Sequence, residues 1–349
     1  MQNVRLCGRT VTAEAALETG DVVLHVPVAH LLLQSSTLHL VLHLYLHRSP
    51  LFILPKRFAR PPCLVALPQE SCTTPPSEPV VSTLPDSFDT FLWHPDVAPF
   101  LPLSVRHKMS RIDADMLKCR TWLKSRLPPG CPFDQPFFSY CWWAVNTRCL
   151  AMPDSLVALA PGFDMLNHSI SGQNARIHTA NDGVYVYATR HIPAHAEIFI
   201  KYGEHDDTIL AVEYGFVLGN AENLNNALCL DEFFPQTSED HVALLQQYGM
   251  WLDFTLSRDA RIGFRLLSAL ILDTCGREYW IRFFLHGREP DDDVLQQARH
   301  AFSRIWDRAR DSYRERLARL HGGPSRLAIV LLQQGLEILD AVDLDNLFH

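Results

Sequence analysis

The sequence of 349 residues predicts an α+β protein in which a strand-rich part, interrupted by a loop and helical insertion, precedes an all-helical part. Short apolar strands bounded by Gly and Pro occur near both ends of the first 220 residues. Between them lie charged segments with helical spacing, and after about residue 233 apolar residues recur with the period of a helix. A mixed part followed by a helical part predicts two lobes.

The first predicted strand is Val22–Pro27, where β-branched residues follow Gly20 and Pro27 ends the strand. A similar layout runs through the apolar strand 198–201 and ends at Gly203. Before it, a turn sequence at 181–183 opens an apolar strand of alternating Val and Tyr. Residues 181–203 are therefore predicted to form a β-hairpin meander.

The insertion covers about residues 31–140. Leu38–Leu46 fits both strand and helix, because Leu recurs every second residue while three histidines recur every fourth. These histidines are His39, His43 and His47. No metal site is expected from them, since no Cys or carboxylate partner lies in that segment. Residues 48–83 are rich in Pro, Ser and Thr and are predicted to be a loop or disordered, whereas 97–127 has a charged helical pattern.

The helical part is predicted over 233–349, with the strand-rich domain over 1–232. The clearest helix of the helical part follows Asp291–Asp293 and ends at the Gly322–Pro324 break. A last helix covers about 326–340. We interpret the three aspartates as a helix cap and not as a calcium site, because the alternating ligand pattern of a calcium loop is missing.

Composition excludes several classes of function. The formal net charge of -8 and the pI near 6.1 argue against a protein that binds phosphate backbones, and suit attraction of basic protein segments. The nine cysteines form no C-x-x-C pair, so reduced thiols and no structural zinc are expected. The sequence has no signal-peptide pattern and no apolar run of about 20 residues, which predicts an intracellular protein, cytoplasmic or nuclear, that does not enter membranes.

Three motifs carry a resemblance: CWWAVNTRCL at 141–150, FDMLNHS at 163–169 and IKYGEHDDTILAVEYGFV at 200–217. Together they resemble the SET domain of the Rubisco-methyltransferase-like class of protein methyltransferases. The resemblance runs from about Leu84 to the end of the chain. It implies a β-rich SET fold with a helical C-terminal substrate-binding lobe, S-adenosyl-L-methionine as cofactor, and a protein lysine as substrate, histones being one candidate.

The resemblance also implies roles for single residues. The central cofactor segment would be Asp164, Met165, Leu166, Asn167 and His168, with Arg148 and the N-terminal loop Cys7, Gly8 and Arg9 completing the cofactor site. Tyr202 would lie at the methyl-transfer centre and also touch the cofactor. Tyr214 would line the substrate channel, and Trp143 and Phe163 would add to the substrate-binding wall.

The chemistry agrees with such a site. Methyl transfer from a sulfonium to an amine is an in-line displacement, so the amine must arrive neutral, desolvated and within about 3 to 3.5 Å. Aromatic faces attract the cationic groups, and a tyrosine hydroxyl can orient the amine. Each residue also has a purely structural alternative: Tyr202 as a packed aromatic, Asn167 and His168 as turn residues, and Arg148 as a surface ion-pair partner.

A rival function stays open: a catalytically silent adaptor that binds a partner through its helical lobe. Thr10 stands where the family usually has a glycine, and only seven residues precede Gly8, which motivates this alternative. A histidine acceptor in place of lysine is also open. In either case we expect a monomer that binds protein and no nucleic acid, because no basic run accompanies Trp142 and Trp143.

Overall fold

The structure is a computed structural model that describes residues 4–7, 10–35, 37, 39, 41, 94–127, 133–235, 237–320 and 326–347. The chain forms two compact units, one from residues 1–89 and 112–203 and the other from residues 90–111 and 204–349. Several predictions lie outside the described residues: those for Gly8, Arg9, His43, His47, the loop at 48–83 and the break at 322–324. The domain boundary near residue 232 stays a prediction.

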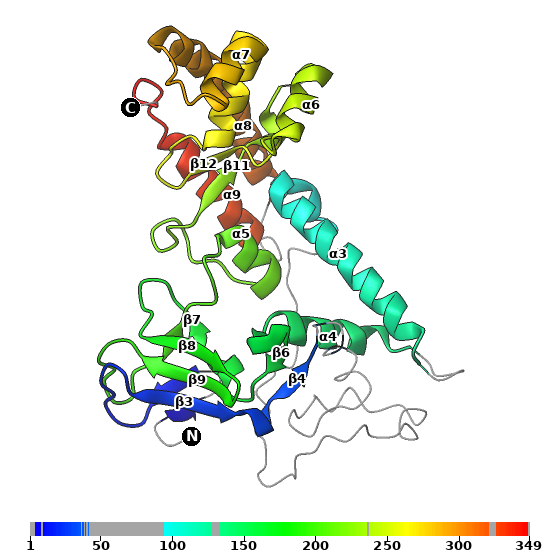
Figure 1. Cartoon of the computed structure of the whole chain (residues 1–349), viewed down its shortest axis with the longest axis vertical. Coiled ribbons are helices and arrows are strands. Elements are labelled where there is room, and N and C mark those ends of the chain that lie inside the picture. Colours follow the sequence, from blue (N-terminus) through cyan, green and yellow to red (C-terminus); the bar gives the residue numbers. More distant parts are fainter. Residues whose placement is uncertain are drawn as a thin grey trace. The chain divides into compact units, whose positions relative to one another are not determined.

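The first unit is built from small sheets (Figure 1). A three-stranded antiparallel sheet has the order β3 (Val22–Pro27), β9 (Gly183–Ala188), β8 (Ala175–Ala180). A second has the order β4 (Leu32–Gln34), β6 (Val157–Leu159), β5 (Leu150–Ala151). At the N-terminal end, β1 (Val4–Cys7) pairs with β2 (Thr10–Ala13). The predicted strand-rich architecture is thus confirmed.

The side chains of β9, the central strand of its sheet, alternate between two faces. Val184 and Val186 are fully buried in the core of the first unit, whereas Tyr185 and Tyr187 stack on each other on the opposite face. At the strand's start Gly183 has φ +155°, and a Cβ there would clash with the carbonyl oxygen of Val26. Only glycine fits this close approach of two strands.

The predicted meander is wrong at its last strand. β10 (Phe199–Ile200) pairs in parallel with β7 (Asn167–His168), and not with β9. The chain between β9 and β10 runs along β2, where Ala13 N–H donates to Ala196 O at 3.0 Å and Ile198 N–H donates to Val11 O at 2.8 Å. These backbone groups are consequently not available to continue a hairpin with β9.

Two helices come from the predicted insertion. α4 (Gln135–Asn146) begins at Asp134, whose carboxylate accepts the N–H of Phe137 at 2.9 Å. Its aromatic residues Phe137 and Phe138 are buried in the first unit. α3 (Leu103–Lys124) confirms the helix expected within 97–127, and the division between the two units falls within it, after Arg111.

The second unit is mostly helical. Its elements are α5 (Asp207–Ile209), which continues as a π-helix over Leu210–Tyr214, β11 (Ala227–Cys229), α6 (Glu239–Gln247), β12 (Thr255–Ser257), α7 (Phe264–Phe284), α8 (Asp292–Arg319) and α9 (Arg326–Asp340). Figure 1 shows α7, α8 and α9 grouped at the C-terminal end of the chain. The antiparallel pair β11–β12 was not predicted, because strands of three residues show no usable periodicity.

The predicted stripe on α8 forms the core of this unit. Phe302, Ile305 and Tyr313 are at most 1% exposed. Asp291 is the N-cap residue as predicted, although its carboxylate accepts from Arg288 at 2.9 Å and makes no cap hydrogen bond. Within the residues that the structure describes, no group of three or more His, Cys, Asp and Glu is arranged to hold a metal ion. None of the described helices is long and apolar enough to cross a membrane.

Candidate active site

The FDMLNHS motif folds as a turn that leads into β7. Gly162 has φ +81°, in the left-handed region, and precedes a short 3-10 helix over Phe163–Met165. The N–H of Leu166 donates to Phe163 O at 3.0 Å and closes this turn. Leu166 is 1% exposed, so the turn is anchored in the core and directs Asn167 and His168 into the parallel pair with β10.

Parallel pairing of β7 with β10 brings the second motif to the first. Ile200 lies opposite His168, and Tyr202 follows two residues later. The N–H of Tyr202 donates to Nδ1 of His168 at 3.0 Å, and the Tyr202 hydroxyl donates to Leu166 O at 2.9 Å. Because a backbone amide only donates, Nδ1 of His168 accepts, and the neutral imidazole carries its proton on Nε2. The two rings lie 5.1 Å apart between centroids, so Tyr202 is folded over the Leu166–His168 segment.

Two residues outside the motifs brace this pair of strands. Asn167 Nδ2 donates to Glu197 Oε1 at 2.7 Å. Asn174 is 7% exposed, accepts the N–H of Phe199 at 2.8 Å and donates to Glu197 O at 2.9 Å. Sequence reasoning missed Asn174 and Glu197, since an isolated Asn or Glu beside a strand carries no pattern that marks it.

Arg148 and Asp164, both predicted cofactor residues, form an ion pair with Nε and Oδ2 3.5 Å apart. Their side chains are 15% and 3% exposed. Arg148 also donates to Thr147 Oγ1 at 2.6 Å. Arg148 is therefore an ion-pair partner, as its structural alternative has it, but the pair is mostly shielded from water and does not lie on the surface, and this partial desolvation makes loss of either partner costly.

The remaining predicted residues of the first unit differ in burial. Phe163 and Met165 are 5% and 7% exposed and pack in the core, and Trp143 is half-buried on α4.

Cys7 is the last residue of β1 and pairs with Thr10. Thr10 lies in the extended backbone of β2, where a β-branched residue is favoured and no glycine is needed. The substitution that motivated the adaptor alternative is therefore compatible with a regular strand.

Tyr214 belongs to the second unit, where it is the last residue of the π-helix Leu210–Tyr214. Gly215 follows with φ +80°, and its N–H donates to Leu210 O. The Tyr214 ring lies 6.1 Å from that of His205 and 6.4 Å from that of Phe216. An ion pair between Lys108 and Glu213, at 3.5 Å, lies next to it. A π-helix is rare and is often found at functional sites.

The small β-sheets of the first unit and the hydrogen bonds that attach Tyr202 to the Leu166–His168 segment agree with the class of protein that the three motifs resemble. The family model of the SET domain matches residues 8–203, which is more than half of the chain. The chain therefore belongs to the SET domain family. The match ends at Gly203, the last residue of the first unit.

The chain is similar in sequence to two known proteins. The chain is 38% identical over 130 residues to ribosomal lysine N-methyltransferase set11 of Schizosaccharomyces pombe, covering 36% of this chain and 33% of that protein. It is 26% identical over 305 residues to SET domain-containing protein 4 of Homo sapiens, covering 76% of this chain and 66% of that protein. The matches thus span from a third to just under two thirds of the length of these relatives.

Solved structures share the fold. The SET domain of LSMT bound to lysine and AdoHcy superposes with a TM-score of 0.63 at 16% identity, over 97% of this chain and 85% of that one. Rubisco LSMT bound to AdoMet gives a TM-score of 0.63 at 15% identity, over 97% and 84%. The predicted resemblance to the Rubisco-methyltransferase-like class and the predicted fold class are both confirmed.

Proposed function

We propose that this chain is an S-adenosyl-L-methionine-dependent protein-lysine N-methyltransferase. The observation that carries the proposal is the double attachment of Tyr202, by its N–H to His168 and by its hydroxyl to Leu166. This attachment joins the residue expected at the transfer centre to the segment expected to bind the cofactor. Membership of the SET domain family supports the same function.

The side chains of the first unit fit the proposed cofactor chemically. S-adenosyl-L-methionine presents a carboxylate, an ammonium, an adenine and a sulfonium, and when bound it supplies an electrophilic methyl group. Arg148 offers a guanidinium for a carboxylate and Asp164 a buried counter-charge, while His168 and Tyr202 offer aromatic faces suited to a cation. The proposed cofactor residues are Cys7, Gly8, Arg9, Arg148, Asp164, Met165, Leu166, Asn167, His168 and Tyr202.

The chain's own part in the reaction is orientation. The bond from its N–H fixes the backbone of Tyr202 and the bond from its hydroxyl fixes the ring, so the hydroxyl oxygen can accept from the amine of a substrate lysine while it donates to Leu166. A fixed acceptor aligns the amine lone pair for in-line attack, and a buried, aromatic surrounding excludes water. Tyr214, Trp143 and Phe163 are the proposed substrate-binding residues.

The proposed substrate is a basic protein. The net charge of -8 favours encounter with basic segments. The relative set11 carries the name of a ribosomal lysine methyltransferase, and we propose ribosomal proteins and histones as the two substrate preparations to compare. We further propose an intracellular location, which fluorescence imaging of the tagged chain would assign to the cytoplasm, the nucleus or both.

The test uses the cofactor with a labelled methyl group and two preparations, purified ribosomes and core histones. Wild-type chain is expected to label one of them, whereas Tyr202→Phe and Asn167→Ala are expected to lose most labelling. Tyr185→Phe is the matched control, because it removes a hydroxyl that donates to exposed Asp182 in the same unit. Equal labelling by wild type, Tyr202→Phe and Asn167→Ala would contradict the proposal.

Calorimetry separates the enzyme from the silent adaptor. An enzyme binds S-adenosyl-L-homocysteine, the product of the cofactor, even when the protein substrate is unknown. An adaptor need bind neither cofactor nor product. Failure of the wild-type chain to bind the product would favour the adaptor.

A further inference from the structure

A buried carboxylate in the second unit organises the segment that carries Tyr214. Asp207 is 2% exposed and is the first residue of α5. Its two oxygens accept hydrogen bonds from five groups: the backbone N–H of Leu218 and Gly219 and the side-chain amides of Asn223, Asn226 and Gln334. We name these six residues the Asp207 cluster. Its shortest bonds, to Gly219, Asn223 and Gln334, are each 2.7 Å.

The cluster joins three parts of the second unit that are distant in sequence. Asp207 begins the helix that ends at Tyr214, Leu218 and Gly219 belong to the segment that returns after Tyr214, and Gln334 lies on α9. Asp207 and Asn226 bond to each other in both directions, since Asn226 Oδ1 also accepts the N–H of Asp207 at 2.8 Å. The helix that carries Tyr214 is therefore held at its start, and the chain after it is held to the same carboxylate.

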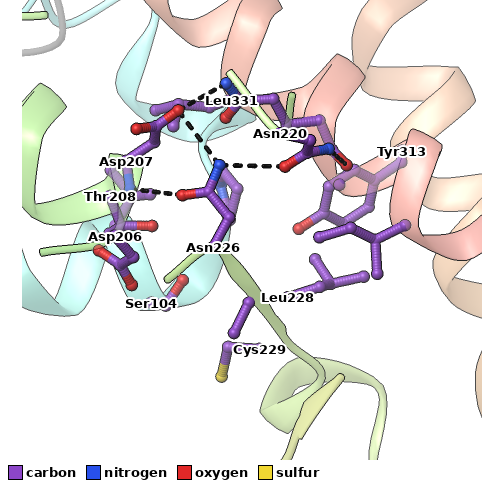
Figure 2. Close-up of a pocket in the computed structure, with 16 residues that line it drawn as sticks. Ser104, Asp206, Asp207, Thr208, Asn220, Asn226, Leu228, Cys229, Tyr313 and Leu331 are labelled. Atoms are coloured by element: carbon purple, nitrogen blue, oxygen red, sulfur yellow. Dashed lines mark hydrogen bonds between the residues drawn. The ribbon is translucent and has the colours of Figure 1, made fainter. Parts of the chain in front are cut away.

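A second route connects the same elements. Asn226 donates to Asn220 Oδ1 at 3.0 Å, and Asn220 Nδ2 donates to Gln334 O at 3.0 Å and to Glu337 at 2.9 Å. Figure 2 shows Asp207, Asn226 and Asn220 directed toward one another, in a pocket also lined by Leu331 of α9 and Tyr313 of α8. Buried polar networks of this kind stabilise one arrangement, because any displacement leaves a donor or the carboxylate unsatisfied.

We infer that Asp207 and Gln334 are positioning residues for substrate binding: through the Asp207 cluster, α9 sets the place of Tyr214 in the second unit. This inference rests on the proposed function, which assigns Tyr214 to the substrate channel. Both residues are proposed to act through Tyr214. The π-helix that ends at Tyr214 supports the inference, since three of its five residues, Leu210, Ala211 and Val212, are fully buried and transmit any shift of Asp207 as a shift of Tyr214.

Gln334→Glu is the decisive variant, because it sets a second carboxylate within hydrogen-bond distance of Asp207. Two such carboxylates cannot both ionise easily, so the pair holds one proton at low pH and loses it as the pH rises. With the proton bound, an O–H···O bond replaces the amide bond. Without it, the two charges repel and the cluster opens.

The surrounding titratable groups are shared by the variant and its control. They are Asp206, which is the N-cap residue of α5, Cys229 on β11, Tyr313 on α8 and Glu337 on α9, with Lys108 of α3 and His205 close to Asp206. Burial raises the pKa of Asp206, of Cys229 and of Tyr313. Gln333→Glu is the matched control, since Gln333 is the adjacent residue of α9 and is exposed.

The experiment measures KM for the protein substrate, using whichever of ribosomes or core histones the wild-type chain labels, from about pH 6 to about pH 9. We expect KM of Gln334→Glu, relative to Gln333→Glu, to rise by about tenfold over this range, and affinity for S-adenosyl-L-homocysteine to stay unchanged. Gln334→Met, which removes the donor without adding charge, should raise KM by a smaller factor that does not change with pH. Protection of the peptide 207–219 from hydrogen exchange, measured relative to the intrinsic exchange rate at each pH, should fall as the pH rises in Gln334→Glu alone.

Two failures are distinguishable. If the wild-type chain labels neither preparation and does not bind the product of the cofactor, the proposed function fails. If the wild-type chain is active but Gln334→Glu and Gln333→Glu have the same KM at every pH, the positioning role is overturned. The same conclusion follows if protection of 207–219 is lost in Gln334→Glu while KM does not change, because the cluster would then open without affecting substrate binding.

Discussion

The N–H of Tyr202 donates to Nδ1 of His168 at 3.0 Å, which joins the two motifs that define the candidate active site. The contact depends on parallel pairing of two strands that are only two residues long. His168 is 8% exposed, so little water is available to replace its acceptor if the imidazole is lost.

His168→Ala is expected to reduce both stability and methyl transfer. The variant leaves the N–H of Tyr202 without this acceptor, at a cost of about 1 to 3 kcal/mol. His168→Asn keeps an acceptor at a similar reach and should retain more activity. Urea unfolding and labelled transfer measure the two effects. Wild-type activity in His168→Ala would show that the contact does not position Tyr202.

Variants of the Arg148–Asp164 pair should separate its contribution to folding stability from its contribution to cofactor binding. Arg148→Met leaves the carboxylate of Asp164, 3% exposed, without this counter-charge, and should cost about 3 to 5 kcal/mol. The double variant Arg148→Met with Asp164→Leu should recover most of that stability but should not recover affinity for S-adenosyl-L-homocysteine. Thermal unfolding and calorimetry give the two readouts. Wild-type affinity in the double variant would remove this pair from the proposed cofactor site.

Asp206 predicts a pH dependence of stability. Its Oδ1 accepts the N–H of Ile209 at 2.8 Å as the N-cap of α5, and burial raises its pKa. A raised pKa in the folded state means that the contribution of this carboxyl to stability is present at low pH and is lost as the pH rises through that pKa. Asn keeps the cap acceptor but does not titrate, so the stability of Asp206→Asn relative to wild type should increase from about pH 4 to about pH 7. A relative stability that falls over this range would contradict the burial of this charge.

Gly335 allows α9 to approach α8. A Cβ at this position would clash with the ring of Tyr313, which is fully buried. Gly335→Ala should therefore destabilise the chain by about 1 to 3 kcal/mol, although Ala favours helices. In the double variant with Tyr313→Leu, the two costs should sum to less than their separate values, since the smaller side chain relieves the clash. Strict additivity in urea unfolding would show that the two residues do not contact each other.

Long, regular patterns were predictable from the sequence. The stripe of α8, the last helix and the strand β9 follow from periodicities of 3.6 and 2, which hydrophobic burial imposes on any sequence. The resemblance placed Tyr202 and His168 in one site, but the contact between them was not predicted, because two-residue strands have no periodicity and their pairing is set by distant backbone groups.

The Asp207 cluster could not be predicted from the sequence, for a related reason. Asp206 is the N-cap residue of α5 and Asp207 is its first residue. No sequence pattern relates Asp207 to Gln334, which lies 127 residues away in the sequence. The π-helix also depends on tertiary packing, since its buried Leu, Ala and Val would suit an ordinary α-helix equally well.

The central claim, that Tyr202 orients a lysine for methyl transfer, is tested most directly by mass spectrometry of the protein substrate. After incubation of ribosomes or core histones with cofactor and wild-type chain, we predict a peptide in which one lysine has gained the mass of a methyl group. With Tyr202→Phe that peptide should be nearly absent, while Tyr185→Phe should yield it at the wild-type level. A methylated lysine formed equally by wild type and Tyr202→Phe, or a methyl group found only on histidine, would contradict the account.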